Sequence, residues 1–164
     1  MSPSPWLGLS AVVLVLDQVT KYAAEALLML HEPVAVIPGF NLTLTYNPGA
    51  AFSFLSGAGG WQRWLFSGFA AVAAIVIVVW LHRLPKSDRL TAAALSLVLG
   101  GAIGNLWDRL APARGKVVDF IDIYVDSWHW PAFNIADSAI VAGVIVLCIT
   151  IVLAPEGEEI KRGR

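Results

Sequence analysis

The sequence predicts an all-α integral membrane protein, a four-transmembrane-helix bundle that carries a small extracytoplasmic β-platform. First, 57% of the 164 residues are hydrophobic and only 14% are charged, whereas soluble domains average about 25% charged residues. Second, four separate stretches hold the roughly 20 mainly apolar residues that a helix needs to cross a bilayer. Third, polar and apolar residues alternate between the first two stretches, as in a half-buried strand. A chain of this length is expected to form a single domain, residues 1–164.

The four predicted spans are separated by two long connections and a short one. The spans cover about residues 6–30, 61–81, 90–110 and 134–154. The second span is the most uniformly apolar, whereas the first and third contain polar residues. The remaining segments are two predicted outer loops and a predicted cytoplasmic tail, at 31–60, 111–133 and 155–164.

Basic residues predict which side of the membrane each loop occupies, because cytoplasmic loops are enriched in Lys and Arg. Loop 31–60 contains neither residue type, whereas loop 111–133 holds Arg114 and Lys116, so the bias is moderate. The short loop and the tail hold six basic residues: Arg83, Lys86, Arg89, Lys161, Arg162 and Arg164. We therefore expect both termini to be cytoplasmic and both long loops to lie outside.

The outer loops contain signals for strands. Residues 41–46 alternate polar and apolar side chains, the period of a half-buried strand, and the turn sequence 47–49 follows. Residues 117–125 are rich in β-branched and aromatic residues, which favours a second strand. The aromatic residues within 128–131 are suited to the level of the lipid headgroups. These segments predict the β-platform.

Two aspartates are the main functional candidates. Asp119 and Asp137 each adjoin an apolar stretch, and an acid close to hydrocarbon is costly and usually functional. Asn134, Asp137 and Ser138 are spaced to share one helix face. Two carboxylates in one site tend to hold one proton between them. The charged acid can then take a proton from water while the neutral acid donates one to a scissile carbonyl.

Other interpretations remain open from spacing alone. Either acid could cap a helix or pair with an arginine. Asp122 is three residues from Asp119, so position does not choose between them, whereas the polar surroundings of Asp126 predict a solvated side chain. A transporter would use such acids as a proton relay, but its acids would be spread through the membrane depth. A third alternative is an assembly factor with only a structural ion pair.

The third span ends in a run of small and polar residues. Gly100 and Gly104 form a small-xxx-small pattern, which allows close helix packing. One face of this span carries a row of residues, Gly101, Asn105 and Asp108 or Arg109. The amide of Asn105 and the guanidinium of Arg109 need partners at membrane depth, and a bound peptide backbone would supply them.

In the first span, Asp17 and Lys21 are four residues apart with the acid first, the favourable order for a helical ion pair. We expect a structural pair that makes two charges tolerable in the membrane. The more specific alternative is that the pair holds the active-site residues in place without contacting the substrate.

Several classes of site and partner are excluded. Cys148 is the only cysteine, and the three histidines are far apart in sequence, so no metal-ligand spacing occurs and no cofactor is implied. The net charge is −1 and no basic run alternates with aromatics, so we expect no nucleic acid partner. Nothing in the sequence implies an oligomer.

Five motifs, in this order, resemble those of the bacterial lipoprotein signal peptidases, the type II signal peptidases. The motifs are DQVTK at 17–21, NPGAAF at 47–52, GGAIGNLWDR at 100–109, VVDF at 117–120 and FNIAD at 133–137. Pro48 is the one departure, since the family has a small or hydroxyl residue there. Because the motifs span most of the chain, the resemblance is specific.

The resemblance implies an aspartyl endopeptidase of the bacterial inner membrane, with its active site near the outer leaflet. The implied substrate is a prolipoprotein whose cysteine already carries a diacylglyceryl group, cleaved just before that cysteine. The family's catalytic pair maps onto Asp119 and Asp137, which favours Asp119 over Asp122. Residues expected to contact substrate map onto Asn47, Gly49, Gly101, Asn105, Arg109 and Asn134.

Overall fold

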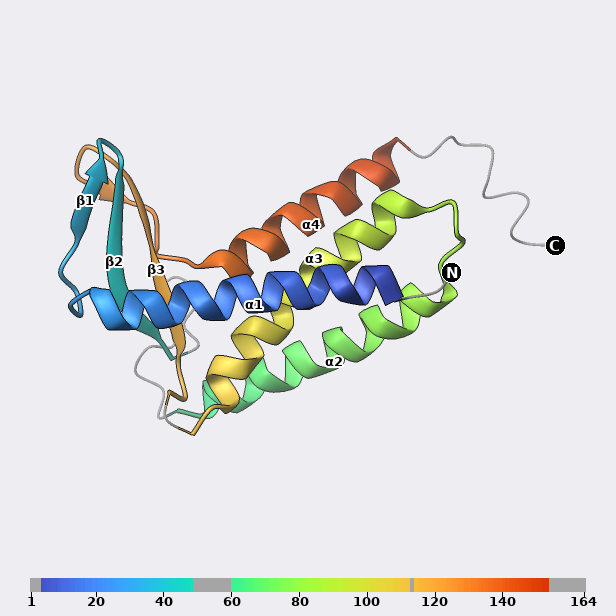
Figure 1. The fold of residues 1–164 in the computed structure, drawn as a ribbon, viewed down its shortest axis with the longest axis horizontal. Coiled ribbons are helices and arrows are strands. Elements are labelled where there is room, and N and C mark those ends of the chain that lie inside the picture. Colours follow the sequence, from blue (N-terminus) through green and yellow to red (C-terminus); the bar gives the residue numbers. More distant parts are fainter. Residues whose placement is uncertain (1–3, 49–59, 113, 154–164) are drawn as a thin grey trace.

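The computed structural model describes residues 4–48, 60–112 and 114–153, which form four helices and four strands (Figure 1). The helices are α1 (Ser4–Leu27), α2 (Trp61–Arg83), α3 (Arg89–Leu110) and α4 (Ile135–Val152). The strands are β1 (Val34–Ile37), β2 (Phe40–Asn47), β3 (Val117–Val125) and β4 (Trp128–His129). All four helices are long and apolar enough to cross a membrane. The predicted fold class is therefore confirmed, while the predicted tail at 155–164 and Gly49 lie outside the described residues.

The four spans were predicted to within a few residues, and the largest difference is at the end of α1. That helix was expected to reach residue 30 but ends at Leu27. The following residues leave the helix to join the sheet: Leu30 bridges Leu44, and the His31 N–H donates to the Leu44 carbonyl at 2.9 Å. Pairing with the sheet thus outweighs the apolar pattern that favoured a longer helix.

Helix α3 is the centre of the bundle and packs against α1, α2 and α4. Its glycines allow the close approach that the sequence predicted. A Cβ at Gly100 would lie 2.7 Å from the Ser10 carbonyl oxygen of α1, and one at Gly143 of α4 would lie 2.6 Å from the Ala94 carbonyl oxygen of α3. Larger side chains would therefore force the helices apart. Between α2 and α3, a core forms around Leu81, with Leu95 and Leu99.

The strands form one antiparallel sheet in the order β1-β2-β3-β4. Both predicted strands, 41–46 and 117–125, are present within β2 and β3. Strands β1 and β4 were not predicted from the sequence. Strand β1 is an uninterrupted apolar run of four exposed residues with no alternation, and β4 has only two residues, too few for any period.

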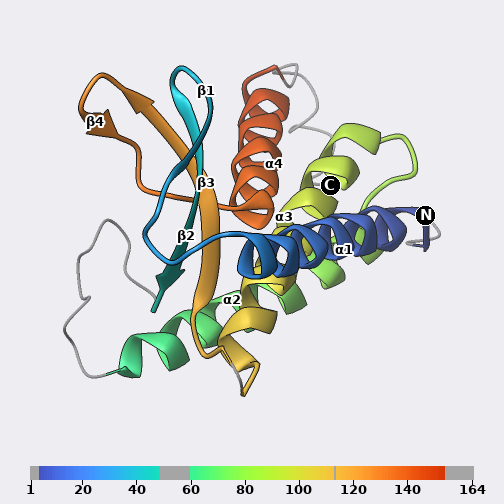
Figure 2. The same ribbon diagram turned by 60° about the vertical axis from the view of Figure 1, so that its left-hand side comes forward.

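The sheet lies at one end of the bundle (Figure 1). The start of α1, the α2–α3 connection and the end of α4 lie at the opposite end. Strand β3 contacts both α1 and α3 (Figure 2). This junction of sheet and helices brings the predicted site residues together.

Candidate active site

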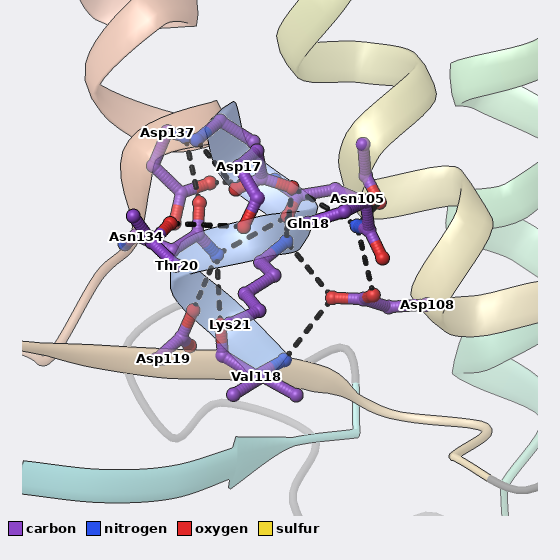
Figure 3. A network of polar contacts seen from close by, with 12 residues as sticks. Asp17, Gln18, Thr20, Lys21, Asn105, Asp108, Val118, Asp119, Asn134 and Asp137 are labelled. Carbon is purple, nitrogen blue, oxygen red and sulfur yellow. Dashed lines mark hydrogen bonds and ion pairs between the residues drawn. The ribbon is translucent and has the colours of Figure 1, made fainter. Parts of the chain in front are cut away.

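Asp119 and Asp137 come from two different elements and share one neighbour, Asn134 (Figure 3). The Asn134 Nδ2 group donates to Asp119 Oδ1 at 2.7 Å. Asn134 is also the N-cap of α4: its Oδ1 accepts from the Asp137 N–H at 2.9 Å, and its own N–H donates to Asp137 Oδ2 at 3.3 Å. A reciprocal capping box satisfies two free donors at a helix start. The local sequence Asn134-x-x-Asp137 thus fixes the start of α4 and also brings the two acids to the same amide.

The two carboxyl groups differ in their surroundings. Asp119 is 3% exposed, whereas Asp137 is half-buried. Burial, and after it the charge of nearby Asp137, raise the pKa of Asp119 to about 7, although hydrogen bonds from Asn134 and Asn47 act in the opposite direction. A buried acid beside a second acid is expected to keep its proton to higher pH. Asp119 can therefore still hold a proton near neutral pH.

A buried lysine stands behind this pair. Lys21 Nζ lies 2.8 Å from Asp17 Oδ2, 2.8 Å from Asp108 Oδ2 and 2.9 Å from Asn105 Oδ1. The side chains of Lys21, Asp17 and Asp108 are all fully buried. The predicted Asp17–Lys21 pair is confirmed. Asp108, in contrast, was considered only as an alternative to Arg109 on the same helix face.

The partners of Lys21 reach the chain next to each acid. Asp17 Oδ1 accepts from the N–H of Ala136, the residue before Asp137, at 2.9 Å. Asp108 Oδ2 accepts from the N–H of Val118, the residue before Asp119, at 3.3 Å. The ion cluster therefore holds the backbone beside both acids. The supporting role that the sequence offered for Asp17 and Lys21 stays a prediction.

Asn105 connects the same lysine directly to the acids. Its Oδ1 accepts from Lys21 and, at 3.2 Å, from Asn134 Nδ2. Its Nδ2 donates to Asp137 Oδ1 at 2.7 Å. The Asn105 side chain thus contacts Lys21, Asn134 and Asp137, and its expected role in substrate binding stays a prediction.

The other predicted site residues are placed differently. The Arg109 guanidinium lies 5.7 Å from the Phe66 ring, and its Nη1 donates to the Asn105 carbonyl at 3.3 Å. Among the residues that the structure describes, its buried Nε has no hydrogen-bond partner. Gly101 packs under α4, where a Cβ would overlap the Ala136 carbonyl oxygen and lie 2.8 Å from Ile140. Gly101 therefore allows α4 to lie close to α3 at the site.

Asp122, which spacing left as an alternative to Asp119, lies in a separate cluster. It accepts from Asn41 Nδ2 at 2.9 Å and lies 2.8 Å from His129 Nδ1. Side chains at an odd separation along a strand point to opposite faces of the sheet. That rule was available from the sequence and separates Asp119 from Asp122. Asp126 is exposed, as predicted.

A pocket of about 430 Å³ opens beside Asp137. The residues that line it are mainly apolar: Trp130, Phe133, Asp137, Ser138, Val141, Ala142 and Ile145. One catalytic candidate therefore faces a cavity that suits an apolar group.

Gln18 and Arg114 were not predicted as site residues. Gln18 Nε2 donates to Asp108 Oδ1 at 3.1 Å and to the Gly104 carbonyl at 3.2 Å. Arg114 lies in the connection between α3 and β3 and contacts Asp108. Gln18 is part of the DQVTK motif, which was a signal, whereas Arg114 stands in no motif. No group of three or more His, Cys, Asp or Glu side chains suited to a metal ion occurs among the described residues.

The raised pKa of Asp119 predicts a pH-dependent effect on stability. An unfolded Asp has a pKa near 3.8 and the folded one about 7, so the folded protein binds more protons between these values. Its free energy of unfolding should therefore fall as pH rises from about 4 to 7, by about 4 kcal/mol at most. Asp119→Asn has no proton to lose and should be more stable than the unmodified protein at pH 8, but not at pH 4, in unfolding experiments in detergent.

The exposed Asp126→Asn is the matched control and should show no such difference between the two pH values. Equal stability of Asp119→Asn and the unmodified protein at pH 8 would contradict a retained proton on Asp119.

Comparisons with known proteins agree on one family. The family model described as Signal peptidase (SPase) II matches residues 9–153. The lipoprotein signal peptidase of Hydrogenovibrio crunogenus is 52% identical over 145 residues, covering 88% of this chain and 82% of the relative. That of Acinetobacter baylyi is 54% identical over 144 residues, covering 88% of this chain and 79% of the relative.

A solved bacterial membrane enzyme has the same fold. It superposes with a TM-score of 0.82 at 31% sequence identity, covering 94% of this chain and 92% of its own. A second solved bacterial membrane enzyme gives a TM-score of 0.79 at 32% identity and covers 93% and 95% of the two chains. The similarity thus extends over the bundle and the sheet.

Proposed function

Because the chain belongs to the signal peptidase II family, it is a membrane peptidase of bacterial lipoprotein processing, and we propose that it is an aspartyl endopeptidase. Its substrate is a diacylglyceryl-modified prolipoprotein, and it removes the signal peptide just before the lipidated cysteine. Family membership disfavours both the transporter and the assembly factor.

In the proposed reaction, Asp137 acts as the base and Asp119 as the acid. The Asp137 carboxylate takes a proton from water, and the water oxygen forms a bond to the scissile carbonyl carbon. Asp119 donates its proton to the carbonyl oxygen, which gives a neutral tetrahedral intermediate. When the carbon–nitrogen bond breaks, Asp137 passes its proton to the leaving amine and Asp119 regains one from the intermediate's hydroxyl.

One observation carries this assignment. Asn134 holds both acids, and the more buried acid, Asp119, has a pKa of about 7 while Asp137 adjoins the open pocket. Near neutral pH the buried group can thus supply a proton, and the accessible group can meet water. An acid and a base in different protonation states at the working pH are what general acid–base catalysis needs.

Binding of the substrate backbone is assigned to polar groups around the acids. The buried Nε of Arg109 has no partner within residues 4–48, 60–112 and 114–153, and a peptide carbonyl would supply one. Asn47, Asn105 and Asn134 contribute amides that hydrogen-bond the two acids, and we assign them to the edge of the substrate site. Gly101 acts by letting α4 approach, and Gly49 lies outside the described residues.

The proposed orientation places the sheet and the acids at the outer leaflet and both termini in the cytoplasm. Its support is that the basic α2–α3 connection lies at the end of the bundle opposite the sheet (Figure 1). Acyl chains on the cysteine would then hold the scissile bond at the depth of the acids. Binding energy from such a remote group can be used to orient the reacting bond.

The test is a cleavage assay on purified protein in detergent, with a diacylglyceryl-modified precursor beside the same precursor without lipid. We expect kcat/KM to fall at least about tenfold without the lipid, equivalent to about 1.4 kcal/mol of lost orientation and binding. Mass spectrometry of the products should find the lipidated cysteine as the new N-terminus.

Equal rates for the two precursors would contradict the proposed use of the lipid. A new N-terminus elsewhere would contradict the proposed cleavage position, and an uncut lipidated precursor would contradict the proposed function itself.

A further inference from the structure

Arg114 lies in the connection between α3 and β3, and its guanidinium links this connection to α1 and α3. Its Nη1 lies 2.7 Å from Asp108 Oδ1 of α3, and its Nη2 pairs with Glu25 Oε2 of α1. The Arg114 side chain is 8% exposed, and its Cζ lies 4.1 Å from the centre of the Tyr22 ring. Paired charges that are this buried are held in a defined geometry, and removing one partner is costly.

The two oxygens of the Asp108 carboxylate face different partners: one faces Arg114, and the other faces the residues beside the acid pair. Oδ1 accepts from Arg114 at 2.7 Å and from Gln18 at 3.1 Å, and Oδ2 faces Lys21 and the Val118 N–H. Arg114 is the charged and the closer of the two donors on Oδ1. Figure 3 shows Asp108 between the lysine and the strand that carries Asp119. Because a carboxylate is planar and rigid, a contact that fixes Oδ1 also fixes the direction in which Oδ2 points. Arg114 thus orients the acceptor for the residue before Asp119.

The loop around Arg114 is held on its other side as well. Gly115 has φ +64°, a conformation that favours glycine, and a Cβ there would lie 2.8 Å from Arg63 Nη1 of α2. Glu25 also accepts from the Tyr46 hydroxyl of β2 at 3.2 Å, and Tyr46 pairs with Val118 across the sheet. The stretch from Arg114 to Val118 is therefore held at its start by ion pairs and at its end by Asp108.

We propose that Arg114 is a positioning residue for Asp119, which it acts on through the Asp108 carboxylate and the Val118 amide. The inference rests on the proposed role of Asp119 as the acid. The requirement is geometric: the planar fork of arginine contacts Asp108 and Glu25 at once, whereas the single ammonium of lysine does not reproduce this arrangement. Displacement of a reacting group by about 1 Å can cost up to about 10²-fold in rate.

The experiment compares Arg114→Gln and Arg114→Lys with the unmodified protein in the cleavage assay. We expect both variants to lower kcat about tenfold or more and to leave KM within about twofold, because the acid is displaced while the substrate contacts remain. Hydrogen exchange of the Val118 amide, followed by mass spectrometry of the peptide that contains it, should become faster in both. The matched control is Lys116→Gln, a change to an exposed basic residue of the same loop, and it should match the unmodified protein in both measurements.

A folded Arg114→Gln variant with unchanged kcat, or one with a change in KM alone, would overturn the proposal. Full recovery of kcat in Arg114→Lys would also overturn it, since charge without the fork would then suffice. If Arg114→Gln does not fold, Glu25→Gln tests the proposal instead, because it removes one ion-pair partner of Arg114 at a side chain that is 21% exposed. The kcat of Glu25→Gln should fall several-fold. An unchanged kcat in this variant overturns the proposal. Failure of the proposed function is distinguishable, because the unmodified protein would then leave the lipidated precursor uncut.

Discussion

Asp119→Asn and Asp137→Asn are each expected to lower the cleavage rate by about 10²–10⁴-fold, the usual contribution of a general acid or base. Asparagine has nearly the same shape as aspartate. Its one oxygen can still accept from Asn134 at position 119 and from Asn105 at position 137, so the fold should persist. What each variant loses is the ability to exchange a proton with water or with the scissile carbonyl. The measurement is kcat on the lipidated precursor, with membrane-extracted protein checked for folding by thermal unfolding.

Asp122→Asn is the informative control, because Asp122 lies three residues from Asp119 on the same strand and binds His129 and Asn41 instead. It should retain most of the activity. Near-normal turnover by either Asp119→Asn or Asp137→Asn would remove the acid pair from the mechanism. A loss in Asp122→Asn as large as that in Asp119→Asn would remove the distinction between the two faces of β3.

The predictable part of the structure is the part with a local pattern. The spans follow from apolar length, β2 and β3 from alternation and β-branched residues, and the Asp17–Lys21 pair from a four-residue spacing on one helix. Even there, local pattern has a limit: α1 stops at Leu27 because Leu30 and His31 pair with Leu44, a contact that no feature of the apolar run encodes.

The site was predictable as a set of residues but less so as a set of contacts. The motifs pointed to Asp119, Asp137 and Asn134, and the structure brings all three together. Spacing on α3 could not tell whether Asp108 or Arg109 faces Lys21, since neighbouring positions differ by about 100° around a helix. The contacts of Arg114 could not be predicted from the sequence, because its partners lie on α1 and α3 and the choice among them depends on tertiary packing.

These contacts explain why a membrane bundle keeps so many buried charges beside the candidate active site. The backbone amides of Ala136 and Val118 each precede an acid, and each donates to a carboxylate that Lys21 also binds. Uncharged side chains in place of this cluster could pack well between the helices, but they would leave those two backbone amides without carboxylate acceptors. The ion cluster therefore links the geometry of two segments that are distant in sequence, and its centre is a single ammonium group.

The second large effect is expected from Lys21→Met, which keeps nearly the length of the side chain and removes the charge. Asp17 and Asp108 would then remain buried without their shared cation. Removing one partner of a buried ion pair typically costs about 3–5 kcal/mol, and we expect a loss of that size in unfolding experiments in detergent micelles. Lys116→Met, at an exposed position in the α3–β3 connection, is the matched control and should leave stability unchanged.

A double variant separates lost charge balance from lost packing. In Lys21→Met with Asp17→Asn, the remaining Asp108 still pairs with Arg114, so the buried charges balance again. We expect this double variant to be more stable than Lys21→Met alone by about 1–3 kcal/mol, the range of coupling between residues in contact. Since the amide oxygen introduced by Asp17→Asn can still accept the Ala136 N–H, the start of α4 should stay in place. A Lys21→Met protein as stable as the unmodified one, or a double variant less stable than the single, would show that the ammonium group does not hold this cluster together.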